Sequence, residues 1–105
     1  MRADLEGHWL ELIGKRLPAL AADREWPVRF DHCFARILLD QLFGDCWYGH
    51  VAGRPAYRKL SDAQLAAVID LGERVAAGAA DLHVLNAQSL AWRSARKRRA
   101  APKLI

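Results

Sequence analysis

The sequence predicts a small all-α bundle of about four helices, and three observations support this fold class. Apolar residues recur at spacings of three and four in four separate segments, which is the period of a helix. No segment alternates apolar and polar residues over a length that would indicate a strand. The chain has 105 residues, of which 52% are hydrophobic and 27% charged, and this is typical of one globular domain.

The first helix is expected from about Ala3 to Leu17. Pro18 follows directly and should end or kink this helix, because proline disfavours a helical residue before it. Residues 19–29 could hold another short turn, interrupted by Pro27. The apolar positions that recur at helical spacing are Leu5, Trp9, Leu12, Ile13 and Leu17.

The second helix is expected from about Phe30 to Phe43, with Gly44 as its C-cap. At about 100° per residue, one broad face is formed by Phe30, Cys33, Phe34, Ile37, Leu38 and Gln41. The opposite side is expected to carry His32, Arg36 and Asp40. Gln41 is the polar exception on the apolar face, and a buried amide must find hydrogen-bond partners.

The third helix has the clearest beginning. Ser61 precedes it, Gln64 follows three residues later, and Leu60 and Leu65 flank the pair, which together predict a capping box with a hydrophobic staple. Gly78 should end this helix. Its apolar stripe is Leu65, Val68, Ile69, Gly72, Val75 and Ala76. The fourth helix begins near Asp81, with Leu82, Leu85, Ser89 and Trp92 on its inner face and Asn86 at the margin.

Residues 45–59 join the second and third helices and are long for a bundle connection, where about 2–8 residues is usual. The segment interleaves aromatic and basic side chains, namely Trp47, Tyr48, His50 and Tyr57 with Arg54, Arg58 and Lys59. Such a composition is typical of a surface that stacks bases or contacts phosphate. The rings could instead fold back and fill the core of a small domain. A third interpretation places these rings around a pocket together with the polar residues Gln41 and Asn86.

The charge is unevenly distributed along the chain. All 12 acidic residues lie at or before Asp81, and residues 1–92 carry ten basic residues, so that this part has a net charge of −2. Residues 93–105 carry +6, so the isoelectric point near 9.5 is a property of the tail. We therefore expect one helical domain over 1–92 and a basic tail over 93–105, which begins as a helix extension and then becomes disordered.

Several classes of protein are not indicated. No apolar run approaches the roughly 20 residues that a membrane span needs, and the first residues do not resemble a signal peptide, so we expect a cytoplasmic protein without a membrane partner. Two cysteines cannot form a disulfide-rich scaffold. No glycine-rich phosphate motif is present, and no cofactor is predicted.

Metal and nucleophile chemistry are weakly indicated. Cys46 and His50 have a spacing that could form half of a zinc site with Cys33 or His32, but the pattern matches no standard finger or ribbon, and we predict no metal. Asp31, His32 and Cys33 are adjacent and point about 100° apart on a helix, so they cannot form a catalytic triad among themselves.

Four stretches resemble a group of short bacterial proteins labelled as GNAT-type (general-control-related) N-acetyltransferases. They are WPVRFDHCFARILLD at 26–40, GDCWY at 44–48, GRPAY at 53–57 and LNAQSLAWR at 85–93. The resemblance implies a shared site within residues 31–57 and, through the label, acetyl transfer. The family's pyrophosphate motif, [QR]-x-x-G-x-[GA], has its nearest counterpart in Gln41-x-x-Gly44-x-Cys46, which differs at the last position.

The sequence leaves two functional hypotheses from different classes, with a helical complex or a homo-oligomer as a third. The first is a non-enzymatic binding protein that engages an acidic partner, either nucleic acid or an acidic protein, through Arg93, Arg96, Lys97, Arg98, Arg99 and Lys103. The second is a small-ligand-binding protein or an enzyme. Its pocket would use Asp31, His32, Arg36, Gln41, Trp47, Tyr48, His50, Arg54, Tyr57 and Asn86.

Overall fold

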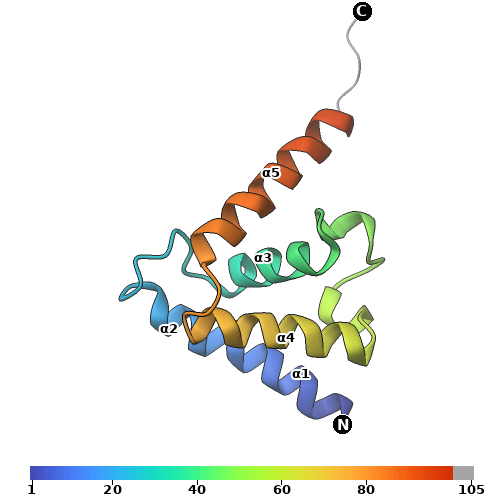
Figure 1. Ribbon diagram of the computed structural model, residues 1–105. Coiled ribbons are helices and arrows are strands. Elements are labelled where there is room, and N and C mark those ends of the chain that lie inside the picture. The colour runs from blue at the N-terminus through green and yellow to red at the C-terminus, as the bar shows by residue number, and fades with distance from the viewer. Residues whose placement is uncertain (101–105) are drawn as a thin grey trace, which may run out of the picture.

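Four helical rods make up the computed structural model, which describes residues 1–100 (Figure 1). The first rod contains α1 (Arg2–Glu11), a π-helical turn (Leu12–Arg16) and α2 (Leu17–Ala21). The others are α3 (Asp31–Phe43), α4 (Asp62–Ala76) and α5 (Leu82–Ala100). No strand occurs in these hundred residues, and the predicted all-α class is confirmed.

The first helix is longer than predicted because it passes through Pro18. Helical backbone continues from Arg2 to Ala21, and Pro18 occupies the first turn of α2. In the π-helical turn before it, the Leu17 N–H bonds to the Leu12 carbonyl five residues back. A proline inside a helix lacks an N–H and crowds the carbonyl four residues earlier, and a widened turn at this point accommodates both effects.

The bounds of α3 agree with the prediction, but the prediction for its faces is partly wrong. Phe30 lies just before the helix and is 65% exposed, whereas Asp40, which was expected on the opposite side, is 0% exposed. The reason is that α3 is packed on two sides, against α4 and the first rod and also against α5. Gly44 ends the helix in the left-handed conformation (φ 63°), as its C-cap role requires.

The capping box of α4 is confirmed, since Ser61 Oγ accepts the Gln64 N–H and Gln64 Oε1 accepts the Ser61 N–H. Gly72, further along α4, allows the helices to approach closely. A Cβ at this position would meet Leu12 and would lie 3.2 Å from Leu38 Cδ1. Gly78 (φ 79°) follows the end of α4. These local features position α4 against the first rod and α3.

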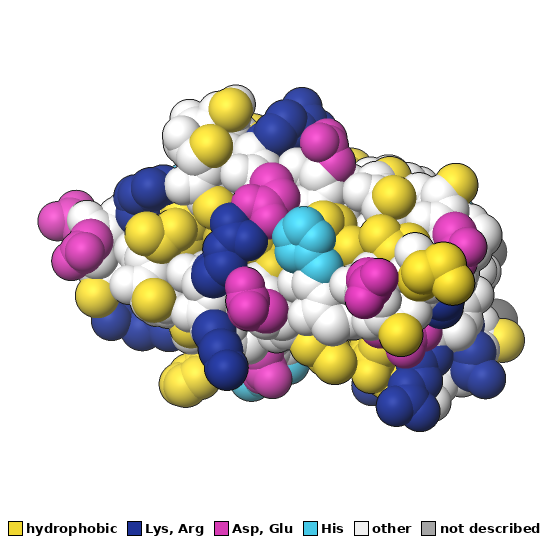
Figure 2. Space-filling model, turned by 90° about the horizontal axis from the view of Figure 1, so that it is seen from below, with side chains coloured by type: hydrophobic (Ala, Val, Ile, Leu, Met, Phe, Trp, Pro, Cys, Tyr) yellow, Lys and Arg dark blue, Asp and Glu magenta, His cyan; other side chains and the backbone are white. Residues whose placement is uncertain are grey.

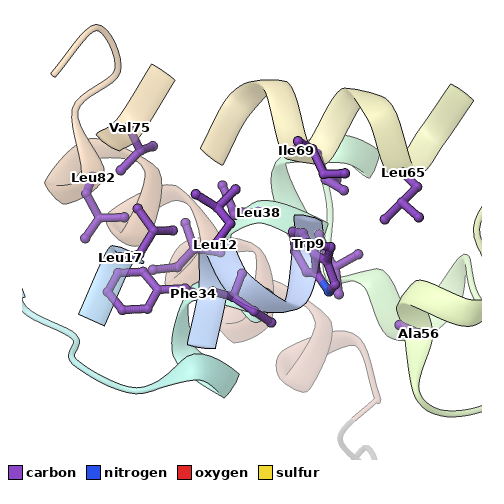
Figure 3. Packing of buried hydrophobic residues seen from close by; sticks show 14 of the residues in the cluster. Trp9, Leu12, Leu17, Phe34, Leu38, Ala56, Leu65, Ile69, Val75 and Leu82 are labelled. Carbon is purple, nitrogen blue, oxygen red and sulfur yellow. The ribbon is translucent and has the colours of Figure 1, made fainter. Parts of the chain in front are cut away.

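The core fills the space between α4, α3 and the first rod (Figure 3). Its fully buried large side chains include Trp9, Leu12, Leu17, Phe34, Ile37, Leu38, Leu65 and Leu82. On α5, Leu82, Asn86 and Ser89 are buried, and Trp92 is only half-buried. The connecting segment 45–59 forms two short 3₁₀ turns, Trp47–Gly49 and Ala56–Lys59, and contributes Trp47 and Ala56 to the core, as does Leu60 directly after it.

The underside of the body, where α1 lies in Figure 1, has acidic and basic side chains interspersed with apolar ones (Figure 2). One cluster that ties the first rod to α4 consists of His8, Arg16 and Glu73. Within residues 1–100, no helix combines the length and the apolar character that crossing a membrane requires.

Candidate functional site: a charged cleft and a basic arm

Asp40 is the buried centre of a polar network between α3 and α5. Arg93 donates to it through Nε (2.9 Å to Oδ2) and Nη2 (3.2 Å to Oδ1), and Ser89 Oγ donates to Oδ2 at 2.6 Å. The Trp47 backbone N–H donates to Oδ1 at 3.0 Å. The network therefore joins α5 and the connecting segment to α3 through one carboxylate. Burial alone would lower the pKa of Arg93, but its hydrogen bonds to Asp40 raise that pKa above its ordinary value.

Arg36 lies one helical turn before Asp40 and extends the network with neutral partners. Its Nη1 donates to Ser89 Oγ and its Nη2 to Asn86 Oδ1, both at 2.8 Å. Ser89 thus accepts a hydrogen bond from Arg36 and donates one to Asp40. Burial lowers the pKa of Arg36, and the positive charge of Arg93 lowers it further.

Tyr48 is surrounded by arginines on the outer side of this network. The guanidinium carbons of Arg93, Arg54 and Arg96 lie 4.7, 5.4 and 6.0 Å from the centre of its ring. Arg54 also lies over Trp47, at 5.4 Å. These distances are those of cation–π contacts. Arg93 and Arg54 lower the pKa of the Tyr48 hydroxyl.

A cleft of about 730 Å³ opens between α1, α3, the connecting segment and Arg93 of α5. Seven of the ten predicted pocket residues line it: Asp31, His32, Arg36, Trp47, Tyr48, Arg54 and Tyr57. The residues that the sequence did not assign to it are Trp9, Leu10, Ile13, Ala35, Leu39, Pro55, Ala56 and Arg93. The helical period of the first rod marked Trp9 and Ile13 as apolar, but it did not indicate that they line a cleft as well as the core.

The other three predicted pocket residues do not line the cleft. Asn86 lies behind Arg36 as its hydrogen-bond acceptor, and Gln41 donates to Gln88 Oε1 at 2.8 Å. His50 stacks on Phe43, with ring centres 4.9 Å apart, and its Nε2 lies 3.2 Å from Asp45 Oδ2. Hydrogen bonds to His50 and to the Cys46 backbone N–H lower the pKa of Asp45.

Residues 94–100, the last turns of α5, form what we call the basic arm. The arm extends beyond the other helices (Figure 1) and carries Arg96, Lys97, Arg98 and Arg99. A small depression of about 220 Å³ at its base is lined by Cys46, Tyr48, Arg93, Arg96 and Lys97. Arg99 Nη2 lies 3.8 Å from Asp45 Oδ1; the Arg99 side chain is largely open to solvent and that of Asp45 is about two-thirds buried. Lys103, the remaining predicted contact, lies outside the described residues.

The two cysteines lie in different surroundings. Cys33 is half-buried on α3, and Cys46 is buried at the start of the connecting segment. Within residues 1–100, no group of three histidine, cysteine or acidic side chains lies close enough to hold a metal ion.

Comparison with protein-family models, with curated proteins and with solved structures finds no match to this chain. The resemblance to the acetyltransferase-labelled group therefore stays a prediction.

Proposed function

We propose that this protein binds nucleic acid through the basic arm of α5. The observation that carries the proposal is the continuation of α5 beyond the body, as a helix with four cationic side chains and no acidic one on it. A helix that is polar on all sides gains nothing from packing on the protein's own core. Its length and charge suit contact with a polyanion.

The spacing of the cations favours a groove over a flat surface. At about 100° per residue, Lys97, Arg98 and Arg99 point to three different sides of the helix, and Arg96 falls between Arg99 and the direction of Arg93. A cationic helix of this kind matches the major groove of a duplex, which admits one α-helix between two phosphate backbones. The arm would then contact phosphates on both sides.

Arg93 is not counted among these contacts, because Asp40 already engages its guanidinium group through two hydrogen bonds. If the four cations of the arm each neutralise one phosphate, the logarithm of the binding constant should fall with the logarithm of salt concentration with a slope of about −3 to −4. A slope of this size indicates a sequence-independent electrostatic mode of binding.

The test compares two triple variants with the same change in net charge. One removes three cations of the arm (K97Q/R98Q/R99Q), and the other removes three exposed cations from the body (K15Q/R29Q/R74Q). Fluorescence anisotropy of a labelled DNA duplex of about 20 base pairs, with salt from about 50 to about 300 mM, gives the affinity and the salt slope of each.

We expect the arm variant to bind at least tenfold more weakly at the lowest salt, with a slope reduced in magnitude by about 3, and the body variant to bind almost as the unmodified protein does. Equal losses in the two variants would mean that only net charge matters. That result, or no binding at the lowest salt, would overturn the proposal.

A further inference from the structure

We infer that the cleft is a binding site for a small aromatic carboxylic acid, with Arg36 as the group that receives the carboxylate. The inference is independent of the proposed nucleic-acid function. It rests on three properties of the cleft, which are a cationic side chain without an acidic partner, flat apolar walls, and a rim that disfavours a second negative charge.

Arg36 differs from three other partly buried arginines in having no carboxylate partner within residues 1–100. Arg93 is held by Asp40, Arg16 by Glu73 and Arg2 by Glu6. Arg36 donates instead to a serine hydroxyl and an amide oxygen, and no carboxylate pairs with it in the part of the chain that the structure describes. Its Nε–H and one N–H on each terminal nitrogen remain for a ligand, because a guanidinium group has five donors.

The guanidinium group of Arg36 is held in a fixed position. Two side-chain hydrogen bonds fix its guanidinium group against α5, so a ligand would not have to order a flexible chain. A planar guanidinium group in this state can form two parallel hydrogen bonds to a carboxylate. Since Arg36 lines the cleft, such a carboxylate would sit with the rest of the ligand in the cleft.

The walls of the cleft suit a flat apolar ring. Tyr48 and Tyr57 of the connecting segment offer partly exposed rings to the cleft, and the nearly buried side chains of Trp9, Ile13, Leu39 and Trp47 form its floor. The volume of about 730 Å³ lies within the range of about 300–1,000 Å³ that is usual for sites of small organic ligands. Aromatic side chains stack favourably on a ligand ring, so the cleft can hold one or two fused rings.

The charges around the cleft favour a monoanion over a polyphosphate. Asp31 lines the same cleft, and its exposed carboxylate would repel a second negative charge at the rim. Arg93 offers little compensation, because Asp40 beneath the cleft already neutralises it, and the remaining cation of the lining, Arg54, lies over the rings of Trp47 and Tyr48. One negative charge at Arg36, with the ring against the aromatic walls, satisfies both constraints.

The test uses 2-naphthoate as the probe and 2-naphthamide, its neutral counterpart of the same shape, as the control. Their dissociation constants are measured by isothermal titration calorimetry for the full chain and for three variants. R36M removes the charge and keeps much of the side-chain length. A35F fills the cleft without changing the charge, since Ala35 lines it. R74M removes an exposed arginine on α4 that pairs with Asp70, well outside the set of cleft residues.

We expect 2-naphthoate to bind at least tenfold more tightly than 2-naphthamide. We expect R36M to raise the dissociation constant of 2-naphthoate at least tenfold while leaving that of 2-naphthamide nearly unchanged, because a hydrogen bond to a charged group is lost. A35F should weaken both probes, and R74M should affect neither.

Equal binding of the two probes would contradict the inference, as would unchanged 2-naphthoate binding in R36M or in A35F. Absence of 2-naphthoate binding at about 1 mM would also contradict it. If R36M does not fold, the preference for 2-naphthoate over 2-naphthamide and the effect of A35F still test whether the cleft binds an aromatic carboxylate. Because K97Q/R98Q/R99Q leaves the cleft intact, its binding of 2-naphthoate should be unchanged, which separates failure of this site from failure of the arm.

Discussion

Arginine occurs in both parts of α5, but its surroundings differ between them. As far as Arg93 the helix packs against α3, with Leu82, Asn86 and Ser89 buried and the charge of Arg93 matched by Asp40. After Arg93 the helix extends beyond the other helices (Figure 1); Arg96 still lies over Tyr48 and Arg99 beside Asp45, whereas Lys97 and Arg98 are exposed to solvent. Arg93 therefore contributes to the stability of the fold, whereas the exposed side chains of Lys97 and Arg98 are available to a partner.

The comparison shows why a count of charges along a sequence can mislead. The six basic residues of 93–105 form one group in the sequence, but the first of them, Arg93, is paired with the buried Asp40 of α3. A boundary that assigns Arg93 to a tail removes from the body the cation that neutralises its buried carboxylate. The first prediction concerns the pair formed by Asp40 and Arg93.

Asp40→Asn should have the largest effect on stability. The substitution leaves the half-buried guanidinium group of Arg93 without its counter-charge and replaces an oxygen that accepts hydrogen bonds with an NH₂ group. We expect the free energy of unfolding to fall by about 3–5 kcal/mol, as when one partner of a buried ion pair is lost. Urea denaturation measures the change.

Asp62→Asn is the matched control for this substitution. Asp62 also pairs with an arginine, Arg2, at 3.0 Å, but its side chain is 74% exposed. Ion pairs of this exposed kind contribute about 0–1 kcal/mol. A loss at Asp40 no larger than that at Asp62 would contradict the structural role of the inner part of α5.

Ser89→Ala should have the next largest effect. The hydroxyl group is buried, donates to Asp40 and accepts from Arg36, so its removal takes one of two hydrogen bonds from Asp40 Oδ2 and leaves one Arg36 N–H without its acceptor. A loss of about 1–3 kcal/mol is expected from urea denaturation. A variant within about 0.5 kcal/mol of the unmodified protein would show that Arg36 and Asp40 do not depend on this bridge.

The cluster around Glu73 provides a comparison with an ion pair nearer the surface. Hydrogen bonds from Arg16 and then from His8 lower the pKa of Glu73 from 4.5 to about 2. A folded-state pKa below the unfolded value stabilises the fold above pH 4.5, and this contribution is lost as the pH falls towards 2. The difference in stability between the unmodified protein and E73Q should therefore shrink over that interval.

Thermal unfolding of both proteins between about pH 7 and about pH 2 measures this difference. Subtracting the E73Q curve removes the contributions of the other carboxyl groups. A difference that does not change with pH would mean that Arg16 and His8 stabilise the folded protein without depending on the charge of Glu73.

The sequence predicted those parts of the fold that depend on neighbouring residues. The capping box of Ser61 and Gln64 and the C-cap at Gly44 are local, and both are present. The pairing of Asp40 with Arg93 joins residues 53 positions apart, so helical periodicity could not reveal it. The course of the first rod through Pro18 depends on a widened turn that has no simple sequence signal.

The candidate site was predicted in part for the same reason. Aromatic and basic side chains in a long connecting segment indicated Trp47, Tyr48, Arg54 and Tyr57, all of which line the cleft. The wall that α1 contributes could not be predicted, because Trp9 has the same spacing as the core residues around it. His50 was placed with the pocket residues by composition alone, and stacking on Phe43 directs it elsewhere.

The most direct test of the division within α5 is urea denaturation of R93M beside the triple variant K97Q/R98Q/R99Q. Our account predicts that the single substitution lowers the free energy of unfolding by about 3–5 kcal/mol, because the buried carboxylate of Asp40 loses its partner. The triple substitution should change it by no more than about 0.5 kcal/mol, as is usual for exposed positions. A triple variant destabilised as much as R93M, or an R93M protein as stable as the unmodified one, would contradict the account.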